Sequence, residues 1–207
     1  MFSRTPALVA AASLLLALVG CQERETQRTE PQTQQPAPQA EPRAQVETGA
    51  AGQAEQPMEA VANLQPTEGH NVSGVVTFTR VAEGVEIVAE VQGLAPGKYG
   101  FHVHEKGDCS APDASSAGEH YNPEGTPHGA PDNPPAQRHA GDLGNIEASA
   151  EGAANFRRVD QVISLEGPQS IIGRTVLVHA GEDDLTSQLS GDSGPRVACG
   201  VIEPKSR

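Results

Sequence analysis

One segment of the chain, residues 101–142, carries five of the seven histidines in a sequence rich in Gly and Pro. It opens with His102 and His104, which are two residues apart in an apolar run. On an extended strand both rings therefore leave the same face, while Val103 points to the other face. Any fold of this chain must pack a long irregular segment against a strand that already presents two imidazoles.

The other residues of this segment are metal-ligand types. Beyond the first pair come three imidazoles and one carboxylate: His120, His128, His139 and Asp142. Such a set suits tetrahedral zinc, which accepts nitrogen and oxygen ligands. His179 ends a β-branched run and can join the first pair. A single histidine is more often a surface or core residue than a ligand. His70 belongs to no motif, and we predict that it is a surface residue.

The rest of the chain is typical of an all-β domain, a sandwich or a flattened barrel. Short apolar runs alternate with Gly, Pro and Asp turn signals at 59–65, 74–80, 85–91, 98–105, 142–148, 153–159, 175–179 and 195–202. No long segment has the helical period. Two connections, 106–141 and 180–194, are too long for hairpins, and loops of that length are usually functional or disordered.

The first 57 residues have a different composition from the domain expected at 58–207. Residues 1–20 resemble a secretory signal peptide, and Leu18-Val19-Gly20 before Cys21 is the bacterial lipoprotein cleavage pattern. Cys21 would then be lipidated; the alternative is a plain signal peptide with an incidental cysteine. Residues 21–57 are rich in Gln, Pro, Ala, Glu and Thr, which predicts a disordered linker, either a tether or a length-tolerant spacer.

Several motifs, in one order over roughly residues 58–204, together resemble the copper/zinc superoxide dismutases. They are Gly100-Phe101-His102-Val103-His104-Glu105, Ser116-Ala117-Gly118, Asn122-Pro123, Gly141-Asp142-Leu143-Gly144-Asn145, Ile172-Gly173-Arg174-Thr175, Val178-His179 and Arg196-Val197-Ala198-Cys199-Gly200-Val201-Ile202. The resemblance implies an eight-stranded Greek-key barrel that binds copper and zinc. It also implies an antioxidant enzyme, a superoxide dismutase that converts superoxide to dioxygen and hydrogen peroxide.

The resemblance also implies how the ligands divide between the two metals. Copper would take His102, His104, His120 and His179. Zinc would take His120, His128, His139 and Asp142. His120 would therefore use both ring nitrogens. In the family this ring leaves copper on reduction and carries one proton, so His120 is a predicted catalytic residue.

Four further residues have roles that only the resemblance implies. Asp183 would link a copper histidine to a zinc histidine, although a turn or N-cap aspartate is the alternative. Arg196 would attract the anionic substrate at the copper, although it could be a surface arginine. Cys109 and Cys199 remain as an even pair once Cys21 is assigned to lipid, and the family joins them in a disulfide; two reduced buried thiols are the alternative.

Charge and the family resemblance limit the expected partners. Residues 58–207 hold 21 Asp and Glu against 10 Lys and Arg, a net of −11, which disfavours nucleic-acid binding. Two metal ions and Arg196 would make the site locally positive for superoxide. The sequence thus predicts an exported bacterial lipoprotein, anchored in the cell envelope through Cys21 and facing the periplasm or the outer surface. A homodimer stays open, and a copper or zinc store or delivery protein is the competing interpretation.

Overall fold

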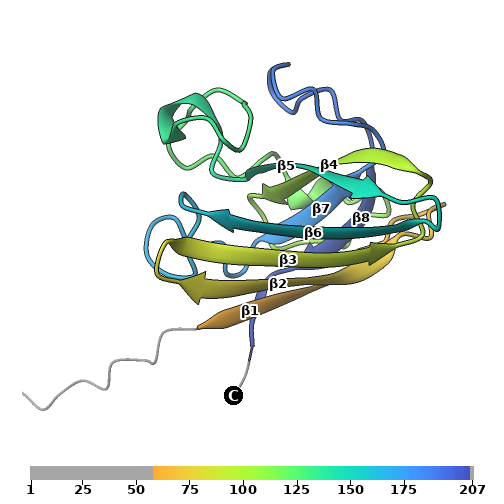
Figure 1. Ribbon diagram of the computed structural model, residues 1–207, viewed down its shortest axis with the longest axis horizontal. Helices are drawn as coiled ribbons and strands as arrows, with labels where there is room; N and C mark the ends of the chain where they lie inside the picture. The colour runs from red at the N-terminus through yellow and green to blue at the C-terminus, as the bar shows by residue number, and fades with distance from the viewer. Residues whose placement is uncertain (1–57, 206–207) are drawn as a thin grey trace, which may run out of the picture. The chain divides into compact units, whose positions relative to one another are not determined.

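The structure is a computed structural model that describes residues 58–205, so the predicted signal peptide, the linker and Cys21 lie outside the described residues. The described chain forms one antiparallel sheet (Figure 1). Its strands are β1 Glu59–Pro66, β2 Ser73–Val81, β3 Gly84–Gln92, β4 Gly97–His104, β5 Asp142–Ala148, β6 Ala153–Asp160, β7 Thr175–His179, β8 Arg196–Val201 and β9 Glu203–Pro204.

The eight predicted runs correspond to β1–β8, and each end agrees to within one residue. The two-residue strand β9, which pairs with β1, was not predicted. Residues 58–205 contain no α-helix and only two single-turn 3-10 segments, Ser115–Ala117 and Pro135–Gln137, both in the first long loop. No helix in this part of the chain is long and apolar enough to span a membrane.

The sheet closes on itself and forms the expected eight-stranded barrel. The strand order is β2-β3-β6-β5-β4-β7-β8-β1, and β1 pairs again with β2. Besides β1 and β8, two neighbouring pairs, β3 with β6 and β4 with β7, are not consecutive in the chain, so the connections between them cross an end of the barrel as in a Greek key. Closure leaves no long unpaired strand edge.

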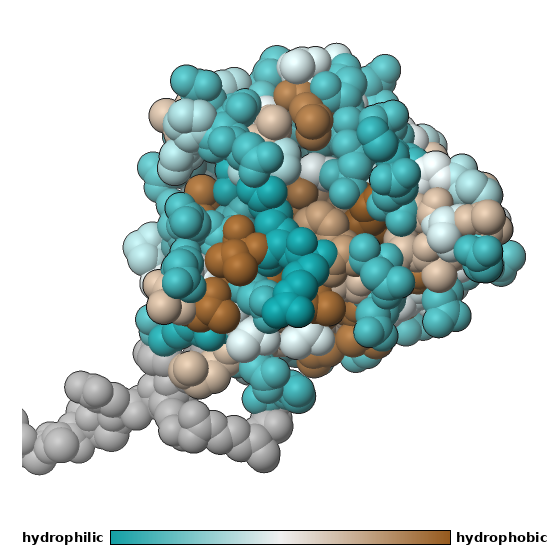
Figure 2. Space-filling model, in the orientation of Figure 1, coloured by the Kyte–Doolittle hydropathy of each residue, from teal (hydrophilic) through white to brown (hydrophobic). Residues whose placement is uncertain are grey.

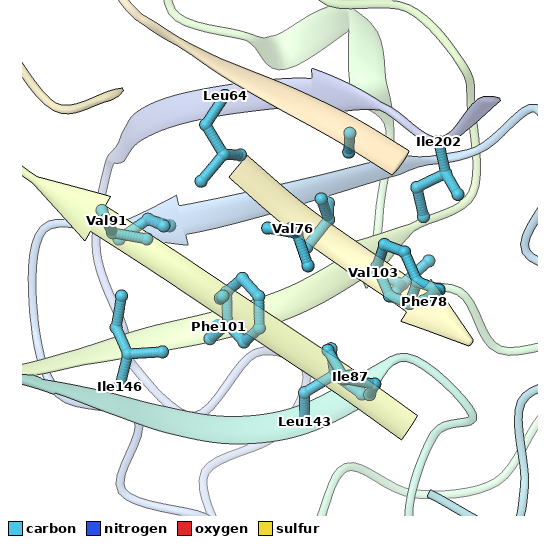
Figure 3. Close-up of a cluster of buried hydrophobic side chains, with 14 of the residues drawn as sticks. Leu64, Val76, Phe78, Ile87, Val91, Phe101, Val103, Leu143, Ile146 and Ile202 are labelled. Atoms are coloured by element: carbon cyan, nitrogen blue, oxygen red, sulfur yellow. The ribbon is translucent and has the colours of Figure 1, made fainter. Parts of the chain in front are cut away.

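The barrel interior is filled because strand residues alternate between the two faces. On β3, Val85, Ile87, Ala89 and Val91 are buried, while the intervening Glu86 and Glu90 face outward. Large apolar side chains from most strands meet in the centre (Figure 3). The largest that are fully buried include Phe78, Phe101, Leu64, Ile87, Leu143 and Ile146. This single core holds the strands that carry the histidines.

Strand β7 differs because all five of its residues are buried. Val176 and Val178 face the barrel core, whereas Leu177 faces outward and packs against Ala114 and Ala117 of the first long loop. By the same alternation, Phe101 and Val103 of β4 are in the core, and the histidines of β4 are on the outer side. The outer face of β4 and β7 is therefore a second buried region, between barrel and loops.

Three connections exceed hairpin length: 105–141, 161–174 and 180–195. The first and third were predicted. The middle one was not, and it contributes Ile163, Leu165 and Ile171 to the core, so it covers one end of the barrel. Its apolar residues are scattered among turn residues and follow neither the strand period nor the helix period. Periodicity in the sequence therefore does not predict that this connection packs against the core.

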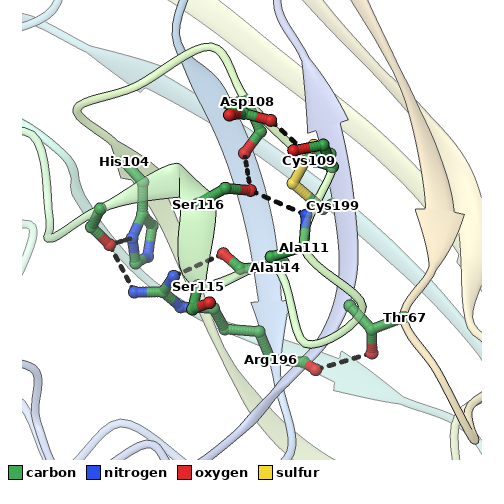
Figure 4. Close-up of a disulfide and its surroundings, with 12 residues drawn as sticks. Thr67, His104, Asp108, Cys109, Ala111, Ala114, Ser115, Ser116, Arg196 and Cys199 are labelled. Carbon is green, nitrogen blue, oxygen red and sulfur yellow. Dashed lines mark hydrogen bonds between the residues drawn. A yellow bond between two sulfur atoms is a disulfide. The ribbon is translucent and has the colours of Figure 1, made fainter.

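Cys109 and Cys199 form the disulfide that the family resemblance implies, across 90 residues of sequence (Figure 4). The bridge joins the first long loop to β8. It belongs to the same small cluster as Leu177, Ala114 and Ala117. The disulfide therefore fixes the loop onto the outer face of β7, beside the histidines.

Figure 2 shows one face, on which apolar residues form groups separated by hydrophilic ones. The large apolar side chains with high exposure in the described residues are Met58, Val75, Val159 and Leu189. Some exposed apolar residues of this kind are normal on the surface of a folded domain.

Candidate metal centre

The outer face of β4 and β7 carries three of the predicted ligands. His102 and His104 leave the same face of β4, and His179 ends β7, which pairs with β4. His120 arrives from the first long loop and forms a short antiparallel bridge with His104. One ring nitrogen of each histidine lies within 4.8 Å of the others, and all four residues are buried. We call these residues the four-imidazole cluster.

Hydrogen bonds determine which nitrogen of each ring faces the centre of this cluster. His104 and His179 each donate Nδ1–H to a backbone carbonyl oxygen at 3.0 Å. His102 donates Nε2–H to Asp183 Oδ2 at 2.8 Å. A neutral imidazole has one N–H and one lone pair. The inward nitrogens of these three rings, Nε2 of His104 and His179 and Nδ1 of His102, therefore carry lone pairs.

No N–H or O–H group of the described residues donates a hydrogen bond to these inward-facing nitrogens. His104 Nε2 and His179 Nε2 are 3.3 Å apart, and because both are acceptors neither can donate to the other. His102 Nδ1 and His120 Nε2 are buried without any hydrogen-bond partner. Buried acceptors that converge on one point are stabilised by a cation. A nitrogen-only set of this kind suits copper.

A second group is organised around a carboxylate at the start of β5. Asp142 Oδ1 lies 2.9 Å from His120 Nδ1, 3.0 Å from His128 Nδ1 and 3.1 Å from His139 Nδ1. The other oxygen, Oδ2, accepts the backbone N–H groups of Gly129 at 3.1 Å and His139 at 2.8 Å. We call His120, His128, His139 and Asp142 the carboxylate cluster.

The carboxylate cluster fits zinc by its donors. Three imidazole nitrogens and one carboxylate oxygen lie within 4.8 Å of one another and are buried. His128 Nδ1 approaches Asp142 Oδ1 without the alignment of a hydrogen bond, so it also lacks a partner. Tetrahedral zinc takes such nitrogen and oxygen ligands, and a zinc ion here would be the partner that His128 Nδ1 lacks.

His120 belongs to both clusters. Its Nδ1 faces Asp142 at 2.9 Å, and its Nε2, on the opposite side of the ring, faces the four-imidazole cluster. Its ring centroid is 4.1 Å from that of His102. One imidazole therefore separates two cation-binding positions, which is the arrangement that the family resemblance implies.

Asp183 also joins the two clusters. Its Oδ2 accepts from His102 Nε2 at 2.8 Å and its Oδ1 accepts from His128 Nε2 at 3.0 Å. Asn145 holds the Asp183 backbone through two hydrogen bonds, at 2.8 Å and 2.9 Å. Gly191, with φ 63°, packs so close to Asp183 that an added Cβ would overlap Oδ1. Asp183 thus lies in the linking position, and its Oδ1 also accepts the Leu185 backbone N–H at 2.7 Å, as a turn aspartate does.

The pKa values agree with neutral imidazoles in the four-imidazole cluster, but not for His128 of the carboxylate cluster. Burial, together with neighbouring imidazoles, lowers the pKa of His102 to about 3. Burial likewise lowers the pKa of His179 to about 4 and that of His104 well below its usual value. For His128 burial is outweighed by the two nearby carboxylates, Asp142 and Asp183, which raise its pKa to about 9. The four-imidazole cluster is therefore uncharged near neutral pH, and the carboxylate cluster holds a charged pair.

Arg196, at the start of β8, is connected to the four-imidazole cluster through one shared backbone carbonyl group. Its guanidinium donates to the carbonyl oxygens of Ala114, at 2.6 Å, and Gly118. The Gly118 oxygen also accepts from His104 Nδ1, and Figure 4 shows both donors on this one atom. Arg196 lines a cavity of about 540 Å³, as does the exposed His70. The arginine is thus fixed beside the cluster, and His70 joins neither cluster.

Sequence reasoning missed Arg138, which holds the carboxylate cluster to the barrel. Its Nη1 donates to the Asp142 carbonyl oxygen at 2.9 Å, and its Nη2 pairs with Asp160 Oδ2 at 2.5 Å. Both members of this ion pair are buried. Asp160 also accepts the backbone N–H groups of Val162 and Ile163. The only signal in the sequence was that Arg138 precedes His139.

Arg174 is the second residue whose role was missed. Its guanidinium lies 3.7 Å from the ring centroid of Tyr121, the neighbour of His120. It also donates to the Glu105 carbonyl oxygen at 2.7 Å and to the Ser170 carbonyl oxygen at 3.0 Å. The connection 161–174 is therefore attached to both sides of the shared histidine. Arg174 was part of a recognised motif, but no local pattern indicated these contacts.

The fold and the two clusters together define a two-metal β-barrel protein. The family description "Copper/zinc superoxide dismutase (SODC)" matches residues 72–202, and the chain belongs to that family. The structure is also similar to a solved crystal structure described as the clock protein EA4. The two share 44% sequence identity with a TM-score of 0.66, over 72% of this chain and 96% of that chain.

These findings confirm the predicted family, fold class and cofactors. The copper/zinc superoxide dismutase family binds copper and zinc, and the two clusters present donors that suit those ions. The disulfide is present as well. Which ion each cluster holds, the catalytic roles of His120 and Arg196, and the boundaries at 20 and 57 stay predictions.

Proposed function

We propose that this domain is a superoxide dismutase that takes two superoxide anions and two protons and releases dioxygen and hydrogen peroxide. The observation that carries the proposal is the shared imidazole of His120, between a nitrogen-only cluster and a cluster with one carboxylate. A copper store would need the first cluster alone. Membership in the family supports the same activity.

Each cluster would hold the ion that its donors favour. The four-imidazole cluster would bind copper, and the carboxylate cluster would bind zinc. Bound copper supplies the one-electron redox chemistry, and zinc supplies fixed geometry without redox change. Asp183 would orient one ligand ring on each side, His102 and His128, because it accepts a hydrogen bond from each.

The protein would also supply a proton and a positive charge. His120 Nε2 is buried and has no hydrogen-bond partner, so when it is free of metal it can hold a proton that peroxide formation requires. Arg196 would attract and orient a small anion at the mouth of the cluster, since its guanidinium is fixed by two carbonyl oxygens. Most acidic groups of the domain would be screened beyond about 8 Å at physiological salt.

Superoxide removal by the metal-loaded domain tests this proposal. The wild-type chain and a His102→Ala variant are loaded with copper and zinc, and superoxide decay is followed by stopped flow. We expect rapid decay with wild type and a rate near background with His102→Ala, because the variant loses one of four copper ligands. Equal rates in the two proteins would contradict the proposal.

A second candidate is a metal-binding protein without enzymatic activity. One observation supports this second candidate. The similar solved structure is described as a clock protein, and that description names a role other than superoxide removal. The two candidates differ in the test above. Tight binding of both ions by the wild-type chain, with superoxide decay no faster than background, would favour the binding protein.

We also propose that the protein is exported and anchored in the bacterial cell envelope through a lipid on Cys21. The supporting features are the short apolar run of residues 7–19 and the cleavage pattern that precedes the cysteine. The domain would then face the periplasm or the outer surface. A Cys21→Ser variant should move from the membrane fraction to the soluble fraction, and its retention in membranes would reject the anchor.

A further inference from the structure

Two cavities open beside the shared histidine, and one residue borders both. The first, of about 540 Å³, is lined by Arg196 and Gly194. The second, of about 200 Å³, is lined by His120 and His139. Glu119 is the one residue that lines both cavities. A small anion that moves from Arg196 towards the shared imidazole therefore passes the Glu119 carboxylate.

The linings of these cavities are more acidic than an anion site requires. Four carboxylates line them, Glu68, Glu105, Asp113 and Glu119, and Arg196 is the only Lys or Arg among the lining residues. The adjacent connection 180–195 contains four Asp or Glu and no Lys or Arg. One guanidinium is therefore the only fixed side-chain cation at this entrance to the clusters.

Glu119 differs from the other three carboxylates because it has no direct side-chain partner among the described residues and directly precedes the predicted ligand His120. Within residues 58–205 its side chain has neither an ion-pair partner nor a hydrogen bond, whereas Asp113 accepts the Ser115 N–H at 2.9 Å. Glu105 lies 3.9 Å from Lys106 Nζ, and Glu68 borders only the Arg196 cavity. The Glu119 backbone is fixed, since its carbonyl oxygen accepts the Glu105 N–H at 2.9 Å.

The charge of Glu119 acts on the arginine. Burial lowers the pKa of Arg196, and the nearby carboxylates of Glu119 and Asp113 oppose that effect. A carboxylate that stabilises the guanidinium charge must also cancel part of the potential that the guanidinium offers to an anion. Glu119 therefore reduces the positive potential on both sides of the path to His120.

We propose that Glu119 is a specificity-determining residue that lowers the affinity of this site for small monoanions. The part of this proposal that concerns superoxide rests on the proposed function. The part that concerns the affinity for other small monoanions does not. The chain would capture substrate more slowly than the same barrel with a neutral residue at position 119. Glu119→Gln tests this, because the amide keeps the shape and the backbone hydrogen bond and removes only the charge.

The test compares wild type, Glu119→Gln and Glu119→Lys, each loaded with copper and zinc. The control is Glu90→Gln, which makes the same change of net charge at an exposed position on β3. One measurement is superoxide decay over a range of ionic strength. The other is a titration with azide, a small monoanion, followed through the visible spectrum of the copper.

At low ionic strength we expect Glu119→Gln to raise both the superoxide rate and the azide affinity about two- to threefold, with the gain fading as salt screens the charge. Glu119→Lys changes the charge by twice as much and should therefore double the change in electrostatic free energy. Its fold-increase in rate and affinity should be about the square of the fold-increase for Glu119→Gln. Glu90→Gln should match wild type in both measurements.

Three results would overturn the proposal: no gain with Glu119→Gln at low salt, an equal gain with Glu90→Gln, or a gain that persists at high salt. Slower copper uptake by Glu119→Gln with unchanged azide affinity would also overturn it and would assign the carboxylate to metal capture. Failure of the proposed function gives a different result, since wild type would then remove no superoxide while the azide titrations still report on Glu119.

Discussion

The two clusters share a ring but are built in different ways. In the four-imidazole cluster, three of the four histidines lie on β4 and β7, and their outer nitrogens are held by backbone carbonyl oxygens or by Asp183. In the carboxylate cluster, three of the four residues lie in the first long loop, and the fourth, Asp142, begins β5. One site is positioned by the barrel and the other by a loop.

This difference shows where the folding energy of each site comes from. The strand cluster is positioned by the same packing that forms the barrel core, because Phe101 and Val103 are buried on the other face of β4. The loop cluster depends on attachments: the disulfide, the Arg138–Asp160 pair and the ion itself. Metal binding to such a loop contributes directly to folding stability.

Removing one ligand from each cluster should give opposite effects on activity and stability. His104→Ala should lower superoxide removal to near background and leave zinc content and melting temperature almost unchanged. His139→Ala should remove zinc and lower the melting temperature by several degrees, because the loop loses its ion. Metal analysis, stopped flow and calorimetry on both variants measure this. Equal loss of melting temperature in both would remove the distinction between strand and loop sites.

The disulfide attaches the loop to the barrel, so its loss should mainly affect stability. For a closed loop of 90 residues the chain-entropy model gives up to about 4–5 kcal/mol. A Cys109→Ser, Cys199→Ser double variant should therefore melt roughly 10–20 °C lower. Calorimetry on the metal-loaded proteins measures the shift, with reduced wild type as the control. An unchanged transition would show that the loop needs no covalent attachment.

Asp183 tests whether the clusters are coupled, because it accepts from His102 and His128. In Asp183→Asn one of the two imidazole N–H groups faces an amide donor, so the affinity for both ions should fall about 10- to 100-fold. Competition with a chelator measures each affinity. Asp192→Asn is the matched control, since Asp192 is exposed at φ 51°, a conformation that asparagine tolerates. Loss of only one ion would mean that Asp183 serves a single cluster.

Arg196→Lys should have the smallest effect of the four. Lysine keeps a positive charge but cannot match the guanidinium bonds to Ala114 and Gly118, so the charge would be less well positioned. We expect a rate about three- to tenfold lower, still dependent on ionic strength, whereas Arg196→Ala should be slower and less salt-dependent. If both variants match wild type in rate and salt dependence, Arg196 has no part in anion capture.

The strands and the ligand types were predictable because they follow local rules. Alternation places His102 and His104 on the face opposite Phe101 and Val103, and the β-branched run before His179 identifies β7. These patterns depend on neighbours within a few residues. Residue type also suggested the zinc set and the grouping of His179 with the first pair. That His120 belongs to both sets, by contrast, came from the resemblance to a family, because spacing in a loop does not fix which imidazoles meet.

The residues that sequence reasoning missed depend on contacts between distant parts of the chain. Arg138 matters because its partner Asp160, which is 22 residues away, ends β6 just before the connection that covers the barrel end. Arg174 matters because Tyr121, next to the shared histidine, lies beneath its guanidinium. A lone arginine carries no periodic signal, and its partner is chosen by the closed barrel. Glu119 directly precedes His120 in the sequence, but its place between two cavities depends on the folded chain.

His120 would bridge two metal ions, and a magnetic measurement tests this bridge most directly. Both clusters are loaded with Cu(II), and the electron paramagnetic resonance spectrum is recorded for wild type and His120→Ala. Because one imidazolate would connect the two unpaired electrons, wild type should give an exchange-coupled spectrum, which His120→Ala should lose. Two independent Cu(II) signals in fully loaded wild type would contradict the shared ring.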